Sequence, residues 1–70
     1  MKTDLRRRRA MEGLSQKALG ERVGVSRQAI NAIETGKHHP SLDLAYRLTA
    51  VFRCQVEDLF ENPYIQDEAP

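Results

Sequence analysis

Four polar side chains lie close together in residues 26–31, at the start of what reads as a short helix: Ser26, Arg27, Gln28 and Asn31. A guanidinium can donate two parallel hydrogen bonds, and a carboxamide can donate and accept at the same time. These groups match the edges of guanine and adenine in the major groove of DNA. The alternative interpretation is that the four side chains are simply solvated on an exposed helix face.

Two short helices joined by a glycine turn would position these side chains. Ser15 can cap the first helix, which we expect to end at Val23, and Ser26 can cap the second, which we expect to reach Glu34. Gly24 would supply the left-handed turn between them. Apolar residues at helical spacing would hold the crossing together: Leu19, Val23, Val25, Ile30 and Ile33. The polar residues then share the outer face, which favours base contact over mere solvation.

The remaining sequence predicts three more helices and no strand, because no segment alternates apolar and polar residues over five or more positions. The first should cover about residues 4–12, with Thr3 as its N-cap and Gly13 as its left-handed C-terminal residue. The others should cover residues 42–52 and 56–61. We expect Ser41 to cap the helix over residues 42–52 and Asn62-Pro63 to stop the helix over residues 56–61. Leu42 should lie on the buried stripe of the first of these helices, together with Ala45, Leu48, Thr49 and Phe52.

Length and composition restrict the classes of protein that the chain can be. Seventy residues make one small domain, which we place at residues 1–61, followed by a tail over residues 62–70. This leaves no room for a small-molecule effector domain, and no nucleophile–base arrangement indicates an enzyme. There is no run of 18 apolar residues and no signal peptide, so we expect a cytoplasmic, nucleoid-associated protein.

Charge is divided unevenly along the chain. Residues 1–39 hold nine Lys and Arg against four Asp and Glu, and residues 40–70 hold two against six, which gives +5 and −4. A basic half that carries the helix pair favours contact with phosphates, although chance segregation of surface charge is the alternative. Gln16 suits a phosphate oxygen, and Lys37 and His38 could hold the DNA backbone beyond the second helix of the pair.

His38, His39 and Cys54 carry side chains that could support other chemistry. Metal binding needs a defined ligand set, and none is visible, so we expect no metal and no cofactor. A phosphate contact by His38 that strengthens on protonation is more plausible. Cys54 is either a redox switch or a small, partly buried residue, and the second is favoured.

Taken together, these features resemble the Cro and phage-repressor type of helix-turn-helix, the xenobiotic-response-element-like regulators. The resemblance covers about residues 4–61. The matching residues are Arg9, Gly13-Leu14-Ser15-Gln16, Leu19, Gly24-Val25-Ser26-Arg27-Gln28, Ile30, Ile33-Glu34-Thr35-Gly36-Lys37, Pro40-Ser41-Leu42 and Val56-Glu57-Asp58-Leu59-Phe60. The resemblance implies an all-α, compact five-helix bundle of the phage-repressor DNA-binding-domain type, with a helix-turn-helix at about residues 15–35. It also implies a homodimer that binds double-stranded DNA at a palindromic operator.

The resemblance further implies roles for single residues. Arg9 would form a buried or half-buried ion pair with Glu34. The base readers would be Arg27, Gln28 and Asn31, and the phosphate contacts would be Ser15, Gln16, Thr35 and Lys37.

Several positions depart from the pattern of this family. Arg8 replaces a residue that is more often apolar, so that the basic run over residues 6–9 could touch the DNA backbone or form an exposed face. Gly20 stands where alanine is usual, at a cost to the helix but with a gain of room for its neighbour. Arg53 and Cys54 stand where glycine and an aliphatic residue are common, which puts the turn before the last helix in question.

The sequence therefore predicts a transcriptional regulator, with repression as its favoured role. The alternatives are an antitoxin or adaptor whose acidic half binds a partner protein, or a restriction–modification controller protein. For a dimer interface the candidates are Leu59 and Phe60, with Tyr64 and Ile65 of the tail either packed on the last helices, placed across a dimer axis or frayed.

Overall fold

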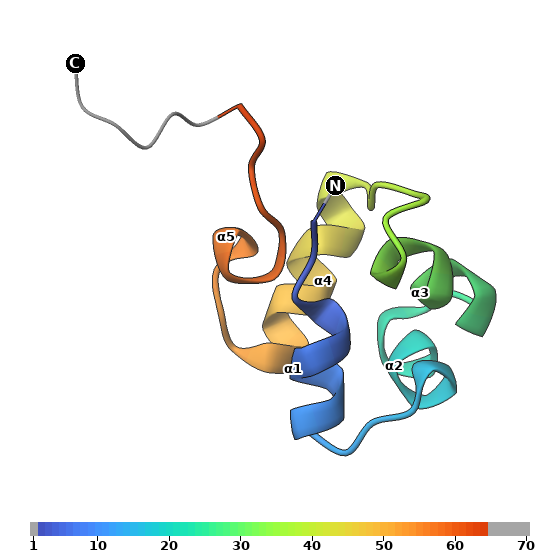
Figure 1. The fold of residues 1–70 in the computed structure, drawn as a ribbon. Helices are drawn as coiled ribbons and strands as arrows, with labels where there is room; N and C mark the ends of the chain where they lie inside the picture. Colours follow the sequence, from blue (N-terminus) through green and yellow to red (C-terminus); the bar gives the residue numbers. More distant parts are fainter. Residues whose placement is uncertain (1, 65–70) are drawn as a thin grey trace.

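The structure, a computed structural model, describes residues 2–64, and its secondary structure is helical. The helices are α1 (Leu5–Met11), α2 (Gln16–Val23), α3 (Arg27–Glu34), α4 (Leu42–Phe52) and α5 (Val56–Leu59). Figure 1 shows α1 lying across α4, with α5 on one side and the α2–α3 pair on the other. Between residues 2 and 64 there is no strand, and none of the helices is long and apolar enough to cross a membrane. The predicted all-α five-helix bundle is confirmed.

One apolar core joins the five helices. Its members are Leu5, Leu19, Val23, Ile30, Ile33, Ala45, Leu48, Phe52, Leu59 and Phe60. The residues predicted to hold the crossing of α2 and α3 are among them, except for the half-buried Val25, which packs against the cluster. Because the buried face of α3 is filled with isoleucines, its opposite face is left for polar side chains.

The helix starts follow from local side-chain chemistry. Ser15, Ser26 and Ser41 each place Oγ to accept the backbone N–H three residues on, at 3.0–3.1 Å. These are the predicted N-caps of α2, α3 and α4. Gly24 ends α2 in the left-handed region at φ 80°, so the glycine turn between α2 and α3 is also confirmed.

A long-range backbone contact shifts the ends of α1 and α5 from their predicted positions. Thr3 and Phe60 form an isolated antiparallel bridge, which takes Phe60 out of the helical conformation. As a result α5 ends at Leu59, before the Asn62-Pro63 pair can act. The N-cap of α1 is Asp4 rather than Thr3, although the Thr3 hydroxyl still accepts the N–H of Leu5 at 3.1 Å.

Two unusual residues keep the turns tight. Arg53 takes the left-handed conformation at φ 54°, so the turn before α5 forms without glycine, at a cost of roughly 1–2 kcal/mol. Gly20 is buried against the turn between α2 and α3, where a Cβ atom would lie 2.5 Å from the carbonyl oxygen of Val25. The glycine at position 20 therefore allows α3 to start close to α2.

Candidate nucleic-acid interface

The outer face of α3 presents Arg27, Gln28 and Asn31 to solvent. All three are exposed, whereas Ile30 and Ile33 on the opposite face are buried. Within residues 2–64, no hydrogen bond uses the side chain of Arg27 or Gln28. Their donors and acceptors are thus available to a partner, and one flat row of such groups on a short helix suits a groove.

Glu34, at the end of α3, is turned away from that row by Arg9 of α1. Arg9 Nε lies 2.6 Å from Glu34 Oε2, and Nη2 lies 3.2 Å from Oε1. The Arg9 and Glu34 side chains are 15% and 3% exposed. Arg9 Nη1 also donates to the carbonyl oxygen of Leu14 at 2.8 Å, and the hydrogen bond to Glu34 raises the pKa of Arg9. The pair ties α1 to α3 and removes a negative charge from the face that would meet DNA.

Gln16 also bonds to Glu34, and this contact was not predicted from the sequence. Its amide nitrogen Nε2 donates to Glu34 Oε1 at 3.0 Å and to Asn31 Oδ1 at 3.2 Å. The nitrogen that was expected to hold a phosphate is therefore bonded to α3. The available signal was the position of Gln16 in the first turn of α2, which in a steep helix crossing faces the end of α3.

The other residues proposed for phosphate contact differ in which of their hydrogen-bonding groups remain free. Ser15 and Ser26 accept in their N-caps but keep a hydroxyl proton to donate. The Thr35 hydroxyl already donates to the carbonyl oxygen of Asn31 at 3.0 Å. Lys37 and His38 are exposed directly after α3. Lys37 and His38 are thus better placed than Thr35 to reach a phosphate.

The expected dimer surface is placed differently by the structure. Leu59 and Phe60 are 1% and 5% exposed because they fill the core of a single chain, which leaves them little surface to offer to a second copy. Tyr64 is 90% exposed, and Ile65 lies outside the described residues. Leu42, expected on the buried stripe of α4, is 66% exposed.

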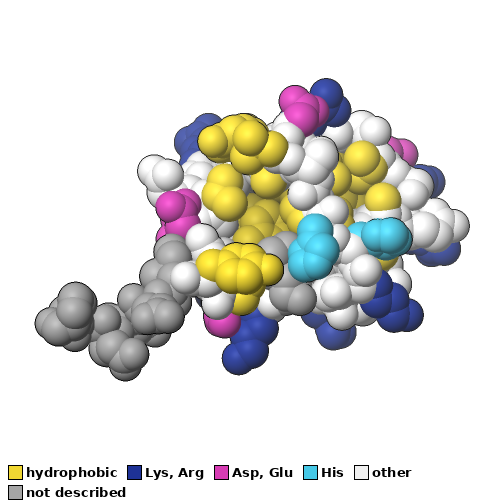
Figure 2. Space-filling view, turned by 90° about the horizontal axis from the view of Figure 1, so that it is seen from above, with side chains coloured by type: hydrophobic (Ala, Val, Ile, Leu, Met, Phe, Trp, Pro, Cys, Tyr) yellow, Lys and Arg dark blue, Asp and Glu magenta, His cyan; other side chains and the backbone are white. Residues whose placement is uncertain are grey.

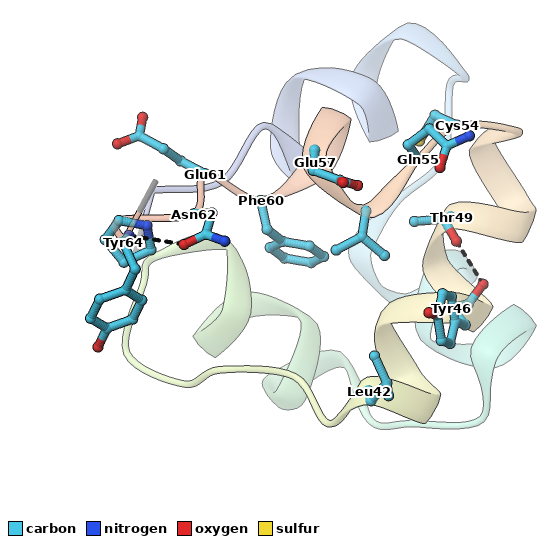
Figure 3. A pocket seen from close by; sticks show the side chains of 12 residues that line it. Leu42, Tyr46, Thr49, Cys54, Gln55, Glu57, Phe60, Glu61, Asn62 and Tyr64 are labelled. Atoms are coloured by element: carbon cyan, nitrogen blue, oxygen red, sulfur yellow. Dashed lines mark hydrogen bonds between the residues drawn. The ribbon is translucent and has the colours of Figure 1, made fainter. Parts of the chain in front are cut away.

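An apolar groove of about 690 Å³ lies between α4 and α5 instead. Leu42 and Tyr46 of α4 line one side and Phe60 the other, and Tyr64 stands at one end (Figure 3). Val56 of α5 also lines the groove. Figure 2 shows hydrophobic side chains gathered around a hollow, with the two histidines beside it. This groove offers an opening that an apolar partner could fill.

Arg8 and Cys54 lie away from the outer face of α3. Arg8 Nε is 3.7 Å from Asp4 Oδ2, and its side chain is 30% exposed. Burial raises the pKa of the Cys54 thiol, which disfavours the reactive thiolate. Cys54 is half-buried against the core, as a small packing residue would be. Residues 2–64 contain no cluster of three or more His, Cys, Asp or Glu side chains that could hold a metal ion.

Comparison with known proteins gives consistent matches over this fold. The profile of the helix-turn-helix family matches residues 5–59. The chain is similar to uncharacterized HTH-type transcriptional regulators from Archaeoglobus fulgidus (47% identity over 60 residues, 86% of each chain) and Methanocaldococcus jannaschii (47%, 86% of this chain and 91% of the other). It is equally similar to YgzD of Bacillus subtilis (47%, 86% and 91%).

Among solved structures, the chain is similar to the P22 c2 repressor protein in complex with a synthetic operator. The two share 32% sequence identity and superpose with a TM-score of 0.73, over 76% of this chain and 80% of the other. The match covers most of the helical bundle and so supports the spatial arrangement that places α3 at the surface.

Proposed function

This chain belongs to the helix-turn-helix family of the Cro and phage-repressor type and is a DNA-binding transcription regulator, and we propose that it represses transcription as a homodimer on a palindromic operator. The observation that carries the proposal is the outer face of α3. Arg27, Gln28 and Asn31 are exposed there, while the carboxylate of Glu34 is withdrawn into an ion pair. The similarity to a repressor whose structure contains its operator supports insertion of α3 in the major groove.

Each exposed residue has a role that fits its chemistry. Arg27 can donate two hydrogen bonds to guanine, and Gln28 can pair with adenine through its amide. Lys37 and His38 would contact phosphates beyond the end of α3, where they add affinity without reading sequence. The hydroxyl protons of the N-cap serines could complete the backbone contacts.

For the homodimer, we propose that a second copy covers the groove between α4 and α5. Leu42, Tyr46 and Tyr64 expose 66%, 59% and 90% of their surface around it, and a second copy would cover this apolar patch. A twofold axis at this groove would pair the same surface of each copy. The two α3 helices should then lie about 34 Å apart, one turn of DNA.

In vitro selection of bound DNA tests the operator part of the proposal. The expected result is a palindrome whose half-sites are about 10 base pairs apart, centre to centre. Arg27→Ala should relax preference at one base pair by about 1–3 kcal/mol, whereas Lys37→Ala should weaken all sequences alike and reduce the salt dependence. Absence of any enriched sequence would rule out the proposal.

Sedimentation equilibrium with Tyr46→Ser tests the dimer. We expect the variant to be monomeric and to lose affinity for the full palindrome, because it removes an apolar side chain from the groove. Met11→Ser is the matched control, since Met11 is 70% exposed and does not line the groove. A wild-type monomer that binds a single half-site would refute the dimer and favour the adaptor or antitoxin alternative, in which another protein occupies the groove.

The direction of regulation needs its own measurement. A reporter gene whose promoter overlaps the selected operator should be less active when the protein is present. Increased reporter activity would contradict repression and leave DNA binding intact.

A further inference from the structure

A continuous chain of hydrogen bonds runs from the interior of the protein to the outer face of α3. Its members are, in order, Arg9, Glu34, Gln16 and Asn31. Arg9 donates to both oxygens of Glu34, at 2.6 and 3.2 Å. Gln16 Nε2 donates to Glu34 Oε1 at 3.0 Å and to Asn31 Oδ1 at 3.2 Å. The first members of the chain are buried or half-buried, and Asn31 is exposed.

The direction of each bond is determined by Glu34. An ionised carboxylate can only accept hydrogen bonds, so Gln16 must turn its NH2 group, and not its oxygen, toward Glu34. The second hydrogen of that NH2 group then points at Asn31. Asn31 must meet it with the amide oxygen, which leaves the Asn31 NH2 group free at the surface.

We propose that Gln16 holds Asn31 as a hydrogen-bond donor toward the major groove and thereby makes it select guanine over adenine. The inference rests on the proposed function, in which α3 enters that groove. An asparagine that pairs with adenine must accept from N6 with its oxygen and donate to N7 with its nitrogen. Guanine presents two acceptors, N7 and O6, and needs only the donors that Asn31 has free.

In this arrangement Gln16 is a specificity-determining positioning residue rather than a backbone contact. Both hydrogens of its amide are used within the protein, one by Glu34 and one by Asn31. A phosphate oxygen would need one of these hydrogens, since it is itself an acceptor. The two roles therefore compete, and binding measurements can separate them.

The test uses the full chain and duplexes of the operator obtained by in vitro selection. Asn31→Ala first identifies the base pair at which preference is lost. At that base pair the wild-type protein should prefer guanine over adenine, and Gln16→Ala should lower the guanine-to-adenine affinity ratio about fivefold, the effect of one net hydrogen bond. Lys17→Ala is the matched control, because Lys17 is the exposed neighbour of Gln16 in α2 and should leave the ratio unchanged.

Two binding results would overturn the proposal while leaving sequence-specific binding intact. One is a wild-type preference for adenine at the Asn31 position. The other is an equal loss of affinity for all four bases in Gln16→Ala, which would make Gln16 a phosphate contact. Failure of the proposed function looks different, because the wild-type protein would then enrich no sequence at all.

A measurement without DNA tests the hydrogen-bond chain itself. In the NMR spectrum of the free protein, Gln16→Ala should shift the Asn31 side-chain carbonyl carbon, which loses its donor, and Lys17→Ala should not. An unchanged Asn31 carbonyl resonance in Gln16→Ala would overturn the proposal whatever the protein binds.

Discussion

Removing one partner of the Arg9–Glu34 pair should cost much of the stability of this protein. Arg9→Met would leave the Glu34 carboxylate, 3% exposed, with Gln16 as its remaining donor. Breaking a buried ion pair in this way costs about 3–5 kcal/mol, since the surviving charge stays out of water. Glu34→Leu should cost a similar amount by leaving the Arg9 guanidinium unpaired.

The cost of breaking this ion pair is a large part of the free energy of unfolding. At about 0.05–0.15 kcal/mol per residue, a chain of this length has a free energy of unfolding of roughly 3.5–10 kcal/mol. A loss of about 3–5 kcal/mol corresponds to a fall in Tm of roughly 12–40 °C for a domain of this size. The double variant Arg9→Met with Glu34→Leu should lie closer to the wild type than either single variant, because neither desolvated charge remains.

Urea denaturation followed by circular dichroism measures these free energies, and the four proteins form a double-mutant cycle. Asp43→Ala is the control, because the Asp43–Arg47 pair has a 2.9 Å contact but side chains that are 74% and 56% exposed. Its loss should cost less than about 1 kcal/mol and shrink further in high salt. Additive single effects, or a cost of Arg9→Met no larger than that of Asp43→Ala, would refute the reasoning.

Three further predictions concern the supporting structure. Gly20→Val should lower stability by about 1–3 kcal/mol in the same assay, because its side chain would collide with the backbone at Val25; an unchanged Tm would contradict this. Ser41→Ala should cost about 1 kcal/mol through loss of the α4 cap, with no change in the DNA sequence selected. Alkylation of Cys54 at about pH 8.5, the ordinary thiol pKa, should be slower in the native protein than in urea. Burial raises the pKa of this thiol, so the unfolded chain ionises first and stability should decline as the pH rises above that value; equal rates would refute the raised pKa.

Most of the helix boundaries could be predicted from local sequence because local chemistry sets them. Serine hydroxyls at residues 15, 26 and 41 start three helices, and Gly24 ends one. The helical spacing of the apolar residues along α3 also indicates which face is buried, since a helix turns each side chain by a constant angle. These features depend on residues within one or two turns of each other.

The errors concern contacts between distant segments. The bridge between Thr3 and Phe60 ends α5 early, and it joins residues at opposite ends of the domain. Leu59 and Phe60 look like surface residues of a short amphipathic helix, but both are buried in the core of a single chain. Likewise, Leu42 continues the apolar stripe of α4 but lies beyond the part of that helix that its neighbours cover.

The sequence by itself thus determined that α3 is a short capped helix with Arg27, Gln28 and Asn31 on its free face. Only the tertiary structure decided what those side chains have left to offer. Gln16 and Asn31 are 15 residues apart in the chain, and their hydrogen bond exists because α2 and α3 cross at that point. Side-chain types are local properties of a sequence, whereas the direction of a hydrogen bond depends on every partner that the fold brings within about 3 Å.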